Sequence, residues 1–94
     1  MLQKPSVGDL LSFEDKYLQE EFNIFLDSTK RDVKKRSYPD RILITNKLYI
    51  LILEATMHNE HGLVRCLVLF ENRTPTLAYF IWNDRVSEKF KLLA

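Results

Sequence analysis

The residues of this sequence best suited to chemistry are two histidines, a cysteine and a run of basic side chains. His58 and His61 flank Glu60, and a His-x-x-His spacing beside a carboxylate is a feature of zinc sites. Tetrahedral zinc needs three or four protein ligands, and here only Glu60 or a residue from elsewhere could complete the set, because Cys66 lies in an apolar, strand-like segment. We therefore interpret the histidines as part of a solvated loop, and we predict no metal and no cofactor.

The other patterns that support catalysis are missing from the sequence. Nucleophilic catalysis needs a Ser, Thr or Cys beside a base, and general acid–base catalysis needs two groups with separated pKa values. The serines fall at expected caps, turns or polar helix positions, where a hydroxyl has a local role. The only glycines are Gly8 and Gly62, too few for a glycine-rich phosphate loop. Cys66 is the only cysteine, and its apolar surroundings predict an unreactive buried thiol. The sequence predicts a protein that is not an enzyme.

Basic side chains cluster in the middle of the chain. The cluster comprises Lys30, Arg31, Lys34, Lys35, Arg36 and Arg41. Clustered Lys and Arg near an aromatic residue such as Tyr38 can contact phosphates and stack a base. The same cations also complement the negative end of a helix dipole, which explains their placement without any ligand. The cluster is therefore a candidate contact for nucleic acid or an acidic partner, although the net charge of +1 gives no global attraction to polyanions.

We expect an N-terminal amphipathic helix to position this cluster. Its apolar side chains recur at spacings of three and four, which places them on one helix face. With Thr29 completing the spacing, the stripe consists of Leu11, Leu18, Phe22, Phe25, Leu26, Thr29 and Val33, and its C-terminal end overlaps the basic cluster. Ser12 and Asp15 form an approximate capping arrangement, and the acidic residues early and basic residues late suit the helix dipole. Pro39 ends the helix, since it biases Tyr38 away from helical dihedrals.

The second half of the chain predicts an antiparallel sheet of about four strands. Runs of β-favouring residues separated by turn-forming residues occupy positions 41–45, 48–57, 63–70 and 77–82. Asn46-Lys47 suits a two-residue hairpin turn between the first two. The last segment fits a short C-terminal helix capped by Asp84, or a fifth strand. We predict one α+β domain over residues 1–94, with the N-terminal helix packed on a four-stranded meander.

These predicted strands are apolar on both faces. In the run from Leu48 to Leu53, one face carries Ile50 and Ile52 and the other carries Tyr49 and Leu51. An uncovered apolar sheet face of more than a few hundred Å² marks an association surface. We therefore expect a homodimer or a heteromeric complex through that face. The candidate interface residues are Tyr49, Leu51, Tyr79 and Trp82.

Two function hypotheses from different classes follow. No apolar run approaches the ~20 residues of a membrane-spanning helix, and the N-terminus lacks the apolar stretch of a signal peptide, so we expect a cytoplasmic protein outside any membrane. The first hypothesis is a small non-enzymatic protein-binding or regulatory module of inhibitor, immunity or adaptor type. The alternative is a nucleic-acid-binding protein, or an mRNA-interferase-like toxin, that uses the basic cluster at residues 30–41; the toxin would add His58 or His61. The predicted order of elements occurs in many unrelated small modules and carries no functional warrant.

Overall fold

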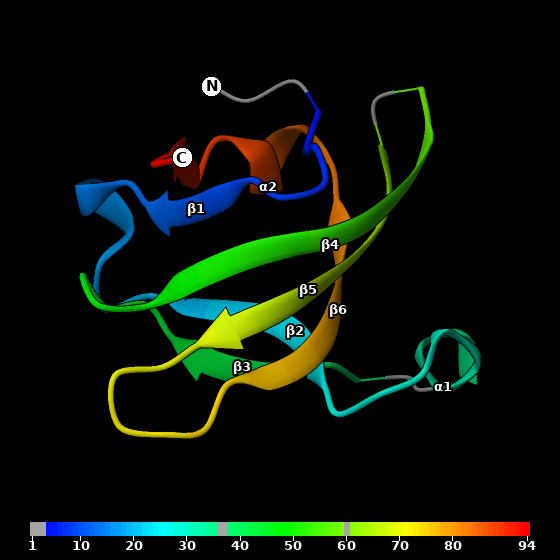
Figure 1. Cartoon of the computed structure of the whole chain (residues 1–94), viewed down its shortest axis with the longest axis horizontal. Coiled ribbons are helices and arrows are strands. Elements are labelled where there is room, and N and C mark those ends of the chain that lie inside the picture. Colours follow the sequence, from blue (N-terminus) through cyan, green and yellow to red (C-terminus); the bar gives the residue numbers. More distant parts are fainter. Residues whose placement is uncertain (1–3, 36–37, 60) are drawn as a thin grey trace.

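The computed structural model describes residues 4–35, 38–59 and 61–94, and its main feature is a seven-stranded antiparallel sheet (Figure 1). The strands are β1 (Leu10–Phe13), β2 (Glu21–Leu26), β3 (Asp40–Leu43), β4 (Tyr49–His58), β5 (His61–Leu69), β6 (Thr76–Trp82) and β7 (Phe90–Leu92). They lie in the order β3-β2-β6-β5-β4-β1-β7. The sheet curls into a half-barrel, so that its inner face wraps around the core (Figure 1).

Among the described residues, three short helical segments connect the strands. They are a 3-10 helix, η1 (Asp15–Tyr17), and the α-helices α1 (Lys30–Lys35) and α2 (Asp84–Ser87). Thr29 caps α1 reciprocally with Asp32: Thr29 Oγ1 accepts from the Asp32 backbone N–H at 3.1 Å, and Asp32 Oδ2 accepts from the Thr29 backbone N–H at 3.2 Å. Asn83 Oδ1 accepts from the Val86 backbone N–H at 2.9 Å and caps α2.

The predicted N-terminal amphipathic helix is wrong, and the α+β architecture with it. The segment instead forms β1, η1, β2 and the two-turn α1. The apolar residues of this segment fit the period of a strand as well as that of a helix. Phe22 and Ile24 are two residues apart in β2, and both point into the core. Gln19 and Asp27 have positive φ angles of 74° and 51°, which a continuous helix does not allow. The aromatic and β-branched residues of β2 favour a strand.

The predicted four-stranded meander is also wrong. The four segments expected as strands are strands β3 to β6, but β3 pairs with β2 rather than with β4. The expected hairpin at Asn46-Lys47 is therefore a turn between strands that do not pair. Its local geometry is that of a tight turn, since the Leu48 backbone N–H donates to the Thr45 carbonyl at 3.3 Å.

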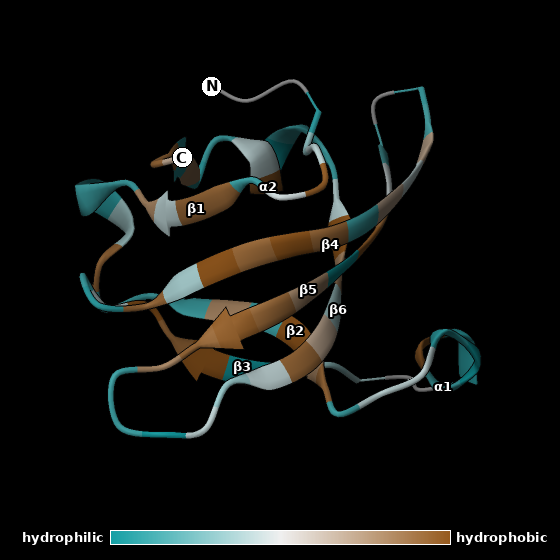
Figure 2. Cartoon of the chain, viewed as in Figure 1, coloured by the Kyte–Doolittle hydropathy of each residue, from teal (hydrophilic) through white to brown (hydrophobic). Residues whose placement is uncertain are grey.

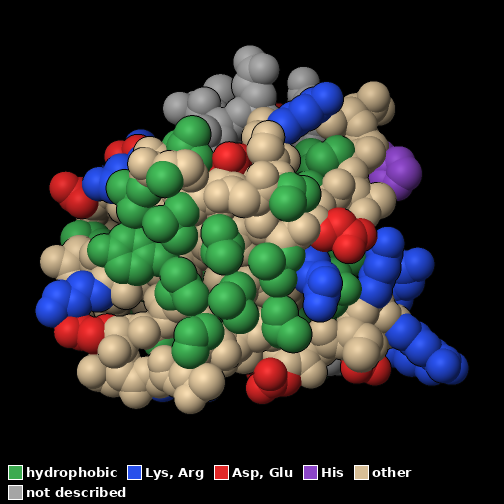
Figure 3. Space-filling model, viewed as in Figure 1, with side chains coloured by type: hydrophobic (Ala, Val, Ile, Leu, Met, Phe, Trp, Pro, Cys, Tyr) green, Lys and Arg blue, Asp and Glu red, His purple; other side chains and the backbone are tan. Residues whose placement is uncertain are grey.

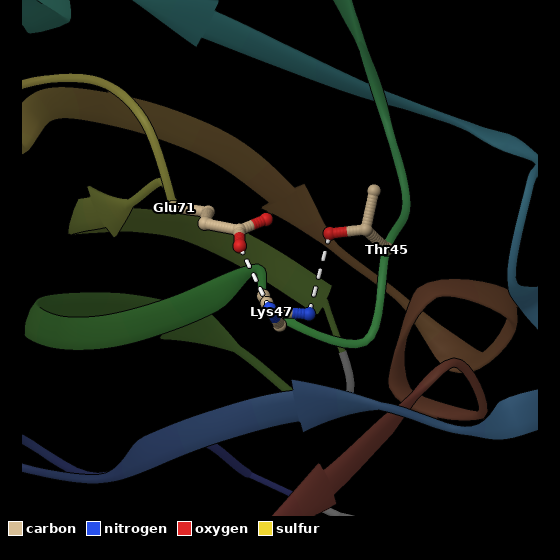
Figure 4. Close-up of polar contacts among 3 residues, drawn as sticks. All are labelled: Thr45, Lys47 and Glu71. Atoms are coloured by element: carbon tan, nitrogen blue, oxygen red, sulfur yellow. Dashed lines mark hydrogen bonds and ion pairs between the residues drawn. The ribbon is translucent and has the colours of Figure 1, made fainter.

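Lys47 links this turn to the β5–β6 connection. Its backbone N–H donates to Thr45 Oγ1 at 3.3 Å, and its ammonium donates to Glu71 Oε1 at 2.8 Å (Figure 4). The hydrogen bond to the Glu71 carboxylate, with its negative charge, raises the pKa of Lys47 above its ordinary value. Both side chains are largely exposed, so the pair positions the turn and adds little to stability.

The C-terminal segment contains both of the elements that were expected as alternatives. It forms the single-turn α2 and then β7, in which Phe90 pairs with Phe13 of β1. Asn83, and not Asp84, is the N-cap residue. After one helical turn, pairing β7 with the free edge of β1 stabilises the fold more than a longer helix would, because the pairing places the Phe90 ring in the core.

The core fills the inner face of the half-barrel and is rich in aromatic rings. Trp82 stacks on Phe90 with a centroid distance of 5.7 Å and an interplanar angle of 4°. Phe90 also contacts Phe13, Phe22 and Phe80, with centroids 4.7 to 5.6 Å away. The curvature of the sheet therefore closes this core, which removes the need for a covering helix.

Candidate functional site

The outer face of the sheet carries a continuous apolar surface, here called the leucine face. It consists of Leu10, Tyr49, Leu51, Leu63, Leu67, Leu69, Leu77, Tyr79 and Ile81. Four of these residues are in register across four strands: Leu10 pairs with Leu51, Leu51 with Leu67, and Leu67 with Leu77. Because paired residues in neighbouring strands point to the same side, their side chains form one row. Figure 2 shows β4 and β5 coloured as hydrophobic along much of their length. Because side chains alternate along a strand, these runs place aliphatic residues on both sides of the sheet.

The leucine face is open to solvent. Leu77 is 45% exposed and Ile81 is 51% exposed, while the other members are half-buried by their neighbours. In Figure 3 a field of apolar side chains occupies the surface over these strands. No helix or strand within residues 4–35, 38–59 and 61–94 is layered over it (Figure 1). A contiguous apolar surface of this kind is typical of a binding site.

Three of the four candidate interface residues lie on this face. Tyr49, Leu51 and Tyr79 are members of it, whereas Trp82 is fully buried in the core on the opposite side of β6. Sequence reasoning missed Leu67, Leu77 and Ile81 as surface residues. Their signal was present in the alternation of β5 and β6, but alternation alone does not indicate which of two apolar faces becomes the core.

A pocket of about 340 Å³ lies at the edge of the leucine face and brings the basic cluster to it. Its lining comprises Asp27, Ser28, Thr29, Lys30, Arg65, Leu77 and Tyr79. Lys30 is the first residue of α1, whereas Leu77 and Tyr79 belong to β6. Arg65 stands beside Tyr79 in the register of β5 and β6, and beside Glu54 in that of β5 and β4. The pocket therefore combines cationic, aromatic and aliphatic groups.

The described members of the basic cluster are exposed and form no ion pair with a carboxylate of the described residues. Lys30, Arg31, Lys34 and Lys35 are exposed on α1 and Arg41 is exposed on β3, while Arg36 lies outside the described residues. In the part of the chain that the structure describes, none of these five cations has an ion pair, and neither does Arg65.

Three lysines outside this cluster each contact a carboxylate. Lys47 pairs with Glu71 at 2.8 Å, Lys89 with Glu20 at 3.7 Å and Lys91 with Asp15 at 3.8 Å. Lys4, Lys16, Arg73 and Arg85 also form no ion pair within the described ranges, so the feature specific to α1 is that four such cations lie on one short helix, and one of them, Lys30, shares a pocket with Arg65. Figure 3 shows Lys and Arg side chains gathered beside the apolar field.

The remaining candidate groups do not converge on a catalytic or metal site. His58 and His61 are exposed and pair across the β4–β5 hairpin, and Glu60 lies outside the described residues. The hairpin end and α1 lie apart in Figure 1, so these histidines do not join the basic cluster. Among the residues that are described, no group of three His, Cys, Asp or Glu side chains could hold a metal ion. Burial raises the pKa of the Cys66 thiol to about 12, which keeps it protonated and unreactive.

One buried hydroxyl, that of Ser12, lies in β1, at the other end of the leucine row from the pocket beside β6. Ser12 is 7% exposed, and its Oγ has no hydrogen-bond partner among the protein atoms of the described residues. It lines a pocket of about 160 Å³ together with Tyr49, Asp15 and Lys91. The Lys91 ammonium is engaged by Asp15, and no base is hydrogen-bonded to the serine, so the arrangement does not form an activated nucleophile.

Comparison with known proteins leaves the chain without an assigned family. No protein-family model, no curated protein and no solved structure matches it. Within the described ranges, none of the helices has the length and apolar character needed to cross a membrane.

Proposed function

We propose that this protein is a small non-enzymatic protein-binding module of regulatory type, which acts through the leucine face. The observation that carries the proposal is the row of Leu10, Leu51, Leu67 and Leu77 across four strands of an uncovered face. Removing half of a leucine side chain from water stabilises a complex by about 1 kcal/mol. Several such residues side by side supply the apolar centre of an interface, with the charged rim around them giving orientation. A cytoplasmic location is part of this proposal.

The self-paired form of the proposal is a homodimer through the leucine face. A standard interface buries about 800 Å² on each partner, and an apolar centre of nine neighbouring side chains fits that size with a polar rim. The sheet edges are poorer surfaces for pairing, because β7 is only three residues long and β3 carries Asp40 and Arg41. A heteromeric complex would use the same face, so the two forms exclude each other.

Nucleic-acid binding is the second candidate function, supported by the unpaired cations of the basic cluster. Single-stranded nucleic acid needs aromatic platforms beside its phosphate contacts. The leucine face offers two aromatic residues, Tyr49 and Tyr79, among seven aliphatic ones. Aliphatic side chains match the apolar side chains of a protein better than they match the faces of bases, and this favours the protein-binding proposal.

Light scattering on a size-exclusion column, with absorbance at 260 and 280 nm, tests the proposal. We expect a dimer free of nucleic acid for the wild-type chain and a monomer for Leu77→Glu, because a carboxylate buried within an apolar interface is not solvated. The matched control is Leu43→Glu, since Leu43 is 51% exposed on β3, outside the leucine face. This control should remain a dimer.

A monodisperse monomer at high micromolar concentration that binds no hydrophobic dye would contradict the proposal. If Leu77→Glu and Leu43→Glu dissociate the dimer equally, the dimer contact does not lie specifically on the leucine face. Nucleic acid that co-elutes and is removed by salt would support the second candidate instead.

A further inference from the structure

We infer that the pocket formed by Lys30, Arg65, Leu77 and Tyr79 binds an acidic segment of a partner polypeptide. The inference rests on the proposed function, because the same segment would lay its apolar side chains on the adjoining part of the leucine face. It adds the chemical class of the partner, which the leucine face alone does not define. The surface therefore combines one apolar half and one cationic half.

Arg65 is one of the two cationic residues that line this pocket. Its side chain is half-buried between two strands, and its guanidinium has no carboxylate partner in the described part of the chain, although Glu54 is its neighbour in register. A guanidinium that is partly removed from water and has free donors binds a carboxylate through two parallel hydrogen bonds. This arrangement provides a site for one Asp or Glu of a partner.

The charges around the pocket are complementary to an acidic segment. Lys30 and Arg65 line it, and the pocket contains a single carboxylate, that of Asp27. Arg31, Lys34 and Lys35 continue the positive charge along α1, where Asp32 is engaged in the cap of the helix. Charge of one sign on one side of an apolar surface steers an oppositely charged partner and fixes its orientation.

An acidic polypeptide fits the pocket better than a nucleic acid does. The only aromatic ring in its lining is that of Tyr79, and the surface then continues into Leu77 and the leucine row rather than into further rings. A polypeptide can place carboxylates on Arg65 and Lys30 and apolar side chains on the leucine row in one extended contact. A nucleic acid would satisfy the cations and leave the leucines uncovered.

The position of the pocket also implies a regulatory effect. Leu77 and Tyr79 belong both to the pocket lining and to the leucine face. An acidic segment bound there occupies part of the surface used for self-pairing. Binding of the segment and formation of the homodimer are therefore mutually exclusive, so each weakens the other by mass action.

A peptide titration of the full chain tests the inference. The probe is a short peptide that alternates leucine and glutamate, and its matched control alternates leucine and lysine. We expect the glutamate peptide to bind, with affinity that falls as salt rises, and the lysine peptide not to bind. Arg65→Gln and Lys30→Gln should each weaken binding by about tenfold, the effect of losing one charge-assisted hydrogen bond. Arg85→Gln, on the remote α2, should leave it unchanged.

The outcomes separate this inference from the proposed function. A wild-type monomer that binds the glutamate peptide refutes self-pairing and supports the pocket. A chain that is a dimer at high concentration but binds neither peptide when diluted until it is monomeric supports the leucine face and overturns the pocket. Equal binding of both peptides, or tighter binding of single-stranded oligouridine with the same loss in Arg65→Gln, also overturns it. The fluorescence of Trp82 verifies that each variant is folded, since this residue is buried away from the pocket.

Discussion

Lys30 and Tyr79 line the same pocket, although one begins α1 and the other lies in β6. The pairing of β2 with β6 brings them together. Leu26, at the end of β2, pairs with Ala78, and the Asp27 backbone N–H donates to the Leu77 carbonyl at 2.8 Å. The chain then turns at Asp27, which has a φ of 51°, and enters α1. The basic cluster and the leucine face are therefore parts of one surface.

The first prediction is that Trp82 reports on the core and not on the interface. It is the only tryptophan, it is 0% exposed, and its ring stacks on Phe90. We expect a blue-shifted emission that acrylamide quenches weakly, and we expect both properties to be the same in the dimer and in monomeric Leu77→Glu. Steady-state fluorescence across a dilution series measures this. An emission maximum that shifts as the dimer dissociates would contradict this prediction and show that Trp82 lies at the interface.

The structure also shows which features the sequence could indicate. The segments of β3 to β6 and their two apolar faces were readable, because period-two alternation of aliphatic residues is a strong local signal. The N-terminal region was misread because residues such as Leu11, Phe22 and Leu26 satisfy both the helical and the strand period. Its true state depends on edge pairing with β3, β4, β6 and β7, which no local pattern encodes.

The surface formed by the pocket and the leucine face could not be predicted from the sequence for a related reason. Lys30 and Tyr79 were both singled out, but for different partners, and no sequence pattern singled out Arg65. Their common pocket exists because β2 crosses from β3 to β6 within six residues. This bend sets the position of α1 against the leucine face, and it is a property of the tertiary structure alone.

A second prediction concerns the close approach of β4 and β5 at Gly62. A methyl group added there would overlap the Thr56 carbonyl oxygen and lie 2.8 Å from the Met57 Cα, and both are backbone atoms. We expect Gly62→Ala to lower the free energy of unfolding by about 1–3 kcal/mol, the usual effect of overpacking. Urea unfolding followed by Trp82 fluorescence measures it.

Gly8→Ala separates this steric effect from a backbone effect. Gly8 has a φ of 91° and no atom within 4 Å of the added methyl group, so only its left-handed conformation opposes the substitution. Its expected loss is about 1–2 kcal/mol. A Gly62→Ala protein as stable as the wild type would show that the β4–β5 hairpin does not approach this closely.

The last prediction is a loss of stability at alkaline pH that depends on Cys66. Burial raises the pKa of this thiol from 9.0 to about 12 in the folded chain, so the folded protein keeps its proton while the unfolded chain releases it. The unfolded state then binds fewer protons, and stability must fall with rising pH. The contribution is fully present below pH 9 and is lost progressively as the pH rises toward 12.

Cys66→Ala isolates this contribution, because tyrosines and lysines also titrate in the same range. Between pH 9 and 11 the wild type should lose up to about 1.4 kcal/mol per pH unit more than the variant does, the limit for release of one proton. Urea unfolding at a series of pH values measures the difference, and the reaction of the thiol with a disulfide reagent should be slow until the chain unfolds. Parallel pH profiles for the two proteins, or rapid modification of the native thiol, would place Cys66 in contact with water and would require a core different from the one described.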